Sequence, residues 1–294
     1  MEKVIVITGP TGVGKTKLSV ALAKKINGEI INGDSMQVYR HLDIGTAKIT
    51  EEEKEGIPHH LFDICDINDN YTIYNYQKDA RNKIKEITKR GHIPIIVGGS
   101  GLYIKAALYD YKLSEETFFS DFNNLTNEEI LKEIKKHHNT DIHVNNRKRL
   151  VRELNKIKNN TVNKSDVNKL LYDVVIIGLT IEREKLYAII DKRVDKMMDN
   201  NLISEVQAFY DKNIYAKSLM TGIGYKELYR YFDRNITLDA AINEIKKNSR
   251  NFAKRQYTFF NHQMNVKWFT VDIDNFNKTI EQVYNYLISL KRIT

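Results

Sequence analysis

A glycine-rich loop set between a hydrophobic strand and an amphipathic helix leaves this chain of 294 residues few possible folds. Residues 9–16 read GPTGVGKT and fit the pattern G-x-x-x-x-G-K-[ST] in full. The run VIVIT at 4–8 predicts a buried strand before the loop, and KLSVALAKK at 17–25 predicts a helix after it. This order predicts an α/β fold with a parallel sheet, in which the loop follows the carboxyl end of the first strand.

The same loop predicts an anion site. Its glycines allow backbone N–H groups to turn toward an anion, the helix N-terminus adds its dipole, and Lys15 adds a positive charge. Thr16 can hold an Mg²⁺ ion beside the phosphates. We expect a di- or triphosphate to be bound by the whole loop: Gly9, Pro10, Thr11, Gly12, Val13, Gly14, Lys15 and Thr16. The motif leaves open whether this phosphate belongs to a nucleotide.

A carboxylate follows the second predicted strand, in the segment EIINGDSMQVY at 29–39. In a doubly wound sheet the carboxyl ends of the strands lie beside the phosphate loop, so we expect Asp34, Ser35 and Gln37 to face the ligand. A carboxylate there can coordinate Mg²⁺ or accept a proton from an attacking group. An aspartate that only caps a turn is the structural alternative.

The third predicted strand, IPIIV at 93–97, is followed by GGSG without an acidic residue. The Walker B aspartate of many ATPases is therefore missing at this strand. Ser100 is not a hydrolase nucleophile either, because the pattern G-x-S-x-G requires glycine where this chain has Leu102.

Composition excludes several classes of protein. Hydrophobic residues make up 41% of the chain, which is enough for a folded core. A single cysteine, Cys65, excludes a disulfide framework and a zinc site built on cysteines. No apolar run approaches the roughly 18 residues that cross a bilayer. We therefore expect a soluble, cytoplasmic protein without a membrane partner.

The basic excess is concentrated in two places. The chain has 46 Lys and Arg against 38 Asp and Glu, a formal net charge of +8. Residues 141–160 hold six basic and two acidic residues, and residues 241–260 hold five basic residues and one acidic residue. Both stretches predict helices with basic residues opposite an apolar face, which suits a phosphate backbone, although a solvated face is the alternative for either alone.

Eight segments of the chain occur in a recognisable order: GPTGVGKT at 9–16, DSMQVY at 34–39, DIGTAK at 43–48, PHHLFDI at 58–64, GGSGLYIKAAL at 98–108, RVDKMM at 193–198, GIGYKEL at 222–228 and NFAKRQYTFF at 251–260. In order and spacing they resemble the tRNA dimethylallyltransferases, also called tRNA isopentenyltransferases. The resemblance covers nearly the whole chain.

The resemblance implies transfer of a dimethylallyl group from dimethylallyl diphosphate to N6 of adenosine 37, next to the anticodon of a tRNA, with release of diphosphate. It implies Mg²⁺ as cofactor and the tRNA anticodon arm as macromolecular partner. It also implies a P-loop NTPase-like parallel sheet core with an inserted, mostly helical tRNA-binding domain. We expect the protein to be a monomer.

Residue roles follow from the resemblance. Asp34, Thr16 and Arg193 are the expected catalytic residues, with Asp34 as the base for the adenine amine and Thr16 as the Mg²⁺ ligand. Arg193 joins the loop in binding the diphosphate. The expected tRNA contacts are Asp34, Ser35, Met36, Gln37, Ser100, Lys148, Arg149, Arg152, Lys246, Lys247, Arg250 and Lys254.

Arg193 also stands out from the residue pattern. We expect a helix from an N-cap at Thr180 through Met198, and Arg193 falls inside its apolar stripe of Leu186, Ile189, Ile190, Val194 and Met197. An arginine that extends from the edge of a core to solvent is the ordinary explanation. Because an unpaired buried guanidinium is costly, an anion should lie close.

The region between about 113 and 170 loses β-branched runs and glycines, and Thr126 to Glu129 form a predicted capping box. We expect a helical insertion over 113–170 in a catalytic core made of 1–112 and 171–294. Members of the family carry a helical insertion that grips tRNA at this point. The chain reads HVNN at 143–146, where the family usually reads close to HPND, while Arg149 and Arg152 match.

Two other functions stay open on the sequence. A P-loop small-molecule kinase, or the related enzyme that prenylates free adenine nucleotides, would not need the two basic stretches. A nucleotide-switched RNA-binding protein without transfer chemistry would not need Asp34 at the strand end, and the missing Walker B acid also argues against it.

Overall fold

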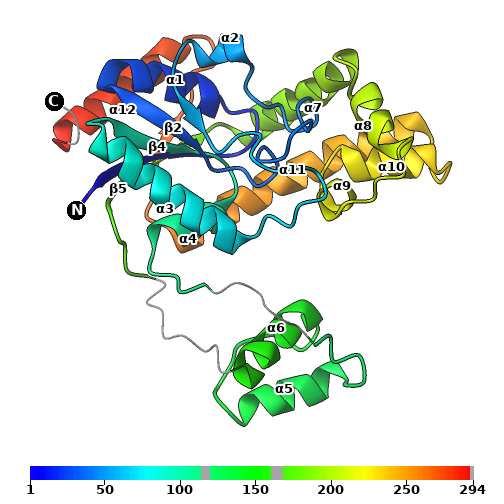
Figure 1. Cartoon of the computed structure of the whole chain (residues 1–294). Helices are drawn as coiled ribbons and strands as arrows, with labels where there is room; N and C mark the ends of the chain where they lie inside the picture. Colours follow the sequence, from blue (N-terminus) through cyan, green and yellow to red (C-terminus); the bar gives the residue numbers. More distant parts are fainter. Residues whose placement is uncertain (114–119, 160–167, 292–294) are drawn as a thin grey trace. The chain divides into compact units, whose positions relative to one another are not determined.

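The computed structural model describes residues 1–113, 120–159 and 168–291. The chain divides into two compact units, one formed by Met1–Tyr109 and Leu170–Thr294 and the other by Asp110–Lys169. The first unit contains the sheet and the second is helical where it is described (Figure 1). None of the described helices is long and apolar enough to cross a membrane.

A parallel sheet forms the centre of the first unit, which confirms the predicted α/β class. Its strand order is β3-β2-β4-β1-β5-β6. The strands are β1 (Lys3–Thr8), β2 (Gly28–Asn32), β3 (His59–His60), β4 (Ile93–Val97), β5 (Asp173–Thr180) and β6 (Lys267–Thr270). β4 lies between β1 and β2, while β5 lies on the other side of β1. The order in which strands are added to the sheet therefore switches from one side of β1 to the other. Ligands bind at such a switch point.

Helices cover both faces of the sheet. Figure 1 shows α1 (Lys15–Ile26) and α12 (Phe276–Ser289) on one side and α3 (Ile73–Lys89) and α4 (Gly101–Leu108) on the other. The remaining helices of this unit are α2 (Glu51–Lys54), α7 (Arg183–Asp199), α8 (Leu202–Tyr210), α9 (Lys217–Thr221), α10 (Tyr225–Phe232) and α11 (Leu238–Gln263).

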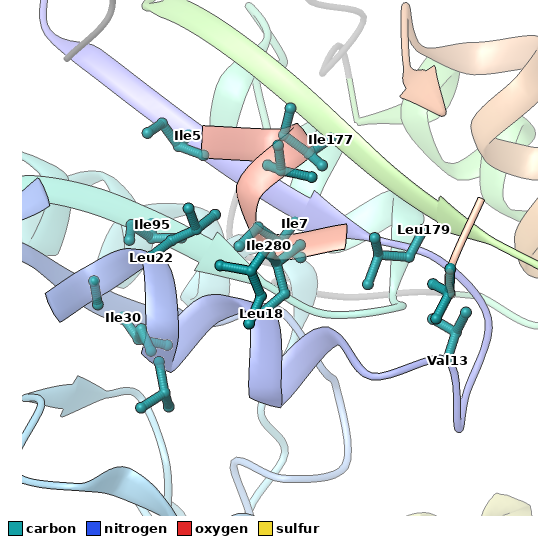
Figure 2. Packing of buried hydrophobic residues seen from close by; sticks show 14 of the residues in the cluster. Ile5, Ile7, Val13, Leu18, Leu22, Ile30, Ile95, Ile177, Leu179 and Ile280 are labelled. Carbon is teal, nitrogen blue, oxygen red and sulfur yellow. The ribbon is translucent and has the colours of Figure 1, made fainter. Parts of the chain in front are cut away.

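The main core lies between the sheet and α1 and α12. Alternate residues of β1, Ile5 and Ile7, pack with Leu18 and Leu22 of α1 and with Ile280 of α12 (Figure 2). Strand residues at i and i+2 share a face, so this alternation points both isoleucines to the same layer. A rigid layer of this kind holds the start of α1, and with it the preceding loop, against β1.

One predicted helix start is wrong. β5 continues through Thr180, which pairs with Thr270 of β6, so Thr180 belongs to a strand and caps no helix. The following helix, α7, begins at Arg183 with Glu182 as its N-cap residue. The predicted apolar stripe holds for its centre, because Leu186, Ile190 and Val194 are buried. The strand partner that extends β5 comes from a distant part of the chain.

The second unit has its own small core. Its helices are α5 (Asn127–Lys135) and α6 (Arg147–Lys158), and the predicted capping box of Thr126 and Glu129 is confirmed at the start of α5. The core consists of Phe122, Ile130, Ile134, Leu150, Leu154 and Ile157. At the start of α6 the Asn146 side chain accepts a hydrogen bond from Arg149 N. Asn146 thus acts as an N-cap, a role that Asn and Asp fill equally well.

Candidate active site

The glycine loop forms one wall of a cavity of about 640 Å³ in the first unit. Positive φ angles of 140°, 84° and 96° at Gly9, Gly12 and Gly14 allow the chain to turn here, and Gly14 is the N-cap of α1. The loop residues that line the cavity are Thr11, Gly12, Gly14, Lys15 and Thr16. Val13 is 3% exposed and packs in the core. The loop therefore has a part that faces the cavity and a part that is buried.

Lys15 is folded back on its own loop. Its Nζ donates to the carbonyl oxygens of Gly9 at 3.0 Å and of Pro10 at 2.8 Å. Burial and the nearby charge of Arg193 lower the pKa of Lys15 to about 7, although Asp34 acts in the opposite direction. The free site therefore holds an amine that gains charge readily when an anion arrives.

Asp34 is held by its neighbours in the chain. Asp34 N donates to Asn32 Oδ1 at 2.8 Å, and Met36 N donates to Asp34 Oδ1 at 2.8 Å. Asn32 is fully buried and donates from Nδ2 to the carbonyl oxygens of Asp34 and Leu61, both at 3.0 Å. Within the described ranges Asp34 Oδ2 accepts no hydrogen bond. A carboxylate that lines the cavity thus keeps one oxygen for a ligand.

The other predicted contacts beside Asp34 have three different surroundings. Gln37 lines the cavity and donates from Nε2 to Thr46 O at 3.1 Å. Ser35 and Ser100 are joined, since Ser35 N donates to Ser100 Oγ at 3.0 Å and the two hydroxyl oxygens lie 3.2 Å apart. Met36 packs against the buried cluster of α8 to α11. Ser35 and Ser100 connect the ends of β2 and β4 next to the cavity.

Arg193 of α7 lines the same cavity as the loop and Asp34. Its Nη2 donates to Thr46 O at 3.3 Å, and no carboxylate lies within ion-pair distance of it in the described ranges. Burial lowers its pKa and Asp34 raises it. A guanidinium so placed has unused donors toward the cavity, as expected of an anion-binding group.

Sequence reasoning missed Gln256 of α11, which joins two loops of the site. Its side chain is 5% exposed, accepts from Thr11 N at 3.2 Å and donates to Gly99 O at 3.1 Å. A polar residue within the buried face of a predicted helix was the available signal.

The two basic helices differ in how much charge they leave free. On α11, Lys246 Nζ lies 2.5 Å from an oxygen of Asp195 and Arg250 pairs with Asp191, both on α7. Lys247 and Lys254 on the same helix are exposed. On α6 the predicted tRNA contacts Lys148, Arg149 and Arg152 are all exposed.

Arg147 at the start of α6 has a different position. Its guanidinium donates to the carbonyl oxygens of Phe122 at 2.8 Å and Leu125 at 3.0 Å. Arg147 therefore stabilises the second unit from within by hydrogen bonds to its backbone.

The donor set suits Mg²⁺. Thr16 and Asp34 supply oxygen atoms at the cavity wall, and Mg²⁺ is commonly held by one or two protein oxygens together with substrate phosphates and waters. No cluster of three or more His, Cys, Asp or Glu side chains suited to a metal occurs in the part of the chain that the structure describes. A magnesium ion at Thr16 would thus be shared with a bound phosphate group.

Comparison with known proteins adds independent findings. A model of the family described as IPP transferase matches residues 37–263. A tRNA dimethylallyltransferase of Anoxybacillus flavithermus is 48% identical over 299 aligned positions, which cover 97% of this chain and 96% of the relative. The matched family segment begins after the glycine loop and Asp34, whereas the alignment with this relative covers nearly the whole chain.

Solved structures agree with this. The tRNA isopentenylpyrophosphate transferase of Bacillus halodurans has a TM-score of 0.77 at 43% identity, with 98% of this chain and 96% of that chain covered. A eukaryotic dimethylallyltransferase acting on tRNA has a TM-score of 0.85 at 29% identity, with 98% and 80% covered. None of these relatives is a kinase or an enzyme of free nucleotides. The chain belongs to the IPP transferase family and is a transferase of the tRNA dimethylallyltransferase type.

Proposed function

We propose that this enzyme transfers the dimethylallyl group of dimethylallyl diphosphate to N6 of adenosine 37 in a tRNA and releases diphosphate. The observation that carries the proposal is one cavity lined by a phosphate loop, by a carboxylate with one oxygen that accepts no hydrogen bond from the described residues, and by an arginine that pairs with no carboxylate among them. These groups match the two charges that the reaction creates. One is negative charge on the leaving group, and the other is the proton lost by the amine.

The leaving group would be bound by the glycine loop and Arg193. When the allylic C–O bond breaks, its electron pair moves to a diphosphate oxygen. Lys15, the amides of the loop and Arg193 would stabilise the charge that develops there. Mg²⁺, held by Thr16 and the diphosphate, would supply further positive charge to the same oxygens.

The acceptor would be the exocyclic amine of adenine, a weak nucleophile because its lone pair is delocalised into the ring. As the N6–C bond forms, the nitrogen becomes acidic and its proton would pass to Asp34 Oδ2. Gln37 presents an amide that matches the donor and acceptor pattern of an adenine edge. A base in a tRNA loop must leave the stack to reach such a cavity.

The tRNA itself would be held by phosphate contacts and by the residues beside Asp34. We propose Lys148, Arg149 and Arg152 of α6, together with Lys247 and Lys254 of α11, as backbone contacts, since all five are exposed. Lys246 and Arg250 would contribute only if they exchanged their α7 carboxylates for phosphate. Ser35, Met36 and Ser100 would contact the target nucleotide. The unit of residues 110–169 would act as the tRNA-binding domain, and the enzyme would act as a cytoplasmic monomer.

The test is a competition between acceptors. The protein is incubated with Mg²⁺, dimethylallyl diphosphate and an unmodified tRNA transcript carrying adenosine 37, with AMP and ATP present, and the nucleosides are identified by mass. We expect dimethylallyladenosine in the tRNA alone. A transcript with guanosine at position 37 is the matched control and should stay unmodified. A prenylated or phosphorylated free nucleotide, or tRNA binding without product, would overturn the proposal.

A further inference from the structure

Glu205 of α8 binds a backbone bend at residues 43–45, beside the candidate active site. Its Oε2 accepts from the N–H groups of Asp43 at 3.1 Å and Ile44 at 2.7 Å, and its Oε1 accepts from Gly45 N at 3.1 Å. The hydroxyl of Tyr225 donates to Oε1 at 2.6 Å. Three successive amides around one carboxylate form an anion-binding nest that the protein fills with its own side chain.

The next residue in the chain faces the active site. Thr46 O accepts hydrogen bonds from Arg193 Nη2 at 3.3 Å and from Gln37 Nε2 at 3.1 Å. It is the hydrogen-bond partner that the structure gives Arg193 within the described ranges. The orientation of the Thr46 carbonyl thus affects Arg193, which is proposed to bind the diphosphate, and Gln37, which is proposed to bind the adenine.

The segment is held at its two ends. Beyond Thr46, Lys48 Nζ donates to Tyr39 O at 2.9 Å and pairs with the carboxylates of Asp43 at 2.6 Å and Asp63 at 2.5 Å. Glu205 holds this segment from a distant part of the sequence, since it lies 160 residues after Gly45. Internal hydrogen bonds also shape the segment, since Ala47 N donates to Ile44 O at 3.0 Å and Thr46 Oγ1 donates to Leu42 O at 2.6 Å. Without Glu205, the amides of residues 43–45 would lose their carboxylate acceptor, and the bend that carries the Thr46 carbonyl would depend on these local bonds alone.

We infer that Glu205 is a positioning residue for prenyl transfer, which holds segment 43–46 so that the Thr46 carbonyl orients Arg193 and Gln37. The inference rests on the proposed function for the roles of those two side chains. The carboxylate is suited to this task, since an ionised acceptor gives stronger hydrogen bonds to N–H and O–H donors than a neutral amide does. Burial and the charge of Glu205 raise the pKa of Tyr225, which keeps its hydroxyl a donor.

The experiment compares Glu205→Gln with Glu227→Gln. Glu227 is a matched control, because its carboxylate is 1% exposed and accepts from Gly224 N at 2.8 Å and Asn248 Nδ2 at 2.7 Å, but it does not contact segment 43–46. The readouts are the affinity for inorganic diphosphate by calorimetry, amide hydrogen exchange at 43–46, and the melting temperature. Glu205→Asp, too short to reach all its partners, serves as a milder variant if Glu205→Gln fails to fold.

For Glu205→Gln we expect roughly tenfold weaker diphosphate binding and faster exchange at 43–46 than in Glu227→Gln, at a similar loss of melting temperature. In an Arg193→Ala background, Glu205→Gln should weaken binding little further, because the route through Arg193 is already removed. Equal losses of affinity in both glutamine variants, or full additivity with Arg193→Ala, would overturn the inference. Wild-type protein that binds diphosphate but does not prenylate tRNA would instead refute the proposed function.

Discussion

Asp34 accepts a hydrogen bond from Met36 N at one carboxylate oxygen, and among the described residues its other oxygen accepts none. The variant Asp34→Asn keeps an oxygen that can accept from Met36 N, but it cannot take up the proton of the adenine amine. We expect the single-turnover rate of prenylation to fall by about 10² to 10⁴, with the dissociation constant for tRNA nearly unchanged. Asp66→Asn, a change in an exposed carboxylate that pairs with Arg40, is the control and should react at the wild-type rate. A normal rate in Asp34→Asn would exclude its role as base.

Lys15 gives a second prediction at this scale. Because its pKa lies at about 7 in the free site, most of the amine is neutral above pH 7. A bound diphosphate favours the ammonium, so binding should take up a proton, and affinity should fall as pH rises above 7. Calorimetry at about pH 8, in buffers of different ionisation enthalpy, measures this uptake. The variant Lys15→Arg carries a permanent charge and should take up fewer protons, so equal uptake in both proteins would contradict the assignment.

The site residues that the sequence predicts lie in contiguous motifs, whereas those it missed act through contacts that a motif does not show. The loop and Asp34 belong to contiguous motifs whose chemistry is local. Gln256 meets Thr11 across 245 residues of chain, and its amide has no motif of its own. Asn32 acts by orienting Asp34 from within a buried strand end. Such contacts depend on the packing of distant segments, which periodicity does not reveal.

Helices and strands show the same division. The strands at 4–8 and 93–97 were predictable because each is a short apolar run next to a loop signal, and they match β1 and β4 closely. The false helix start at Thr180 arose because β6, a distant strand, extends β5. The basic face of α11 was visible in the sequence, but the α7 carboxylates that neutralise half of its four predicted contacts were not.

At this scale α11 also serves the phosphate loop. Gln256→Ala removes the hydrogen bonds to Thr11 N and Gly99 O, and each unpaired group costs about 1–3 kcal/mol where it is buried. We expect diphosphate binding to weaken roughly five- to a hundredfold. Gln77→Ala is the matched control, since this buried amide of α3 donates to Ala106 O at 2.8 Å away from the cavity. Equal weakening in both variants would show a general loss of stability.

Gly99→Ala tests the same contact from its other side. A Cβ at residue 99 would lie 1.9 Å from Gln256 Nε2, so the glutamine side chain would have to leave Thr11. We expect Gly99→Ala to weaken diphosphate binding about as much as Gln256→Ala, and the double variant to be no weaker than either single one. Additive effects would mean that Gly99 acts on the loop by another route.

Taken as a whole, the molecule carries its net charge of +8 mainly on two helices. The ion pairs of α11 leave α6 as the helix whose predicted tRNA contacts are all exposed. Since binding to phosphates releases counterions, the affinity for tRNA should fall as salt rises, with a slope set by the number of phosphates bound. The division of the chain into two units makes this testable without disturbing the cavity, because α6 packs in a separate core.

Charge reversal of both Arg149 and Arg152 should weaken tRNA binding at low salt. It should also reduce the slope of log affinity against log salt by about one for each phosphate that these arginines bind in the wild-type protein. Diphosphate affinity should stay at its wild-type value, because both residues lie outside the unit that contains the cavity. Lys132→Glu with Lys135→Glu on α5 makes the same change in charge on exposed residues of the same unit and is the control. If the two pairs reduce the slope equally, unit 110–169 attracts tRNA only by its total charge. If neither does, it takes no part in binding tRNA, and the phosphates must be bound by α11 and the rim of the cavity.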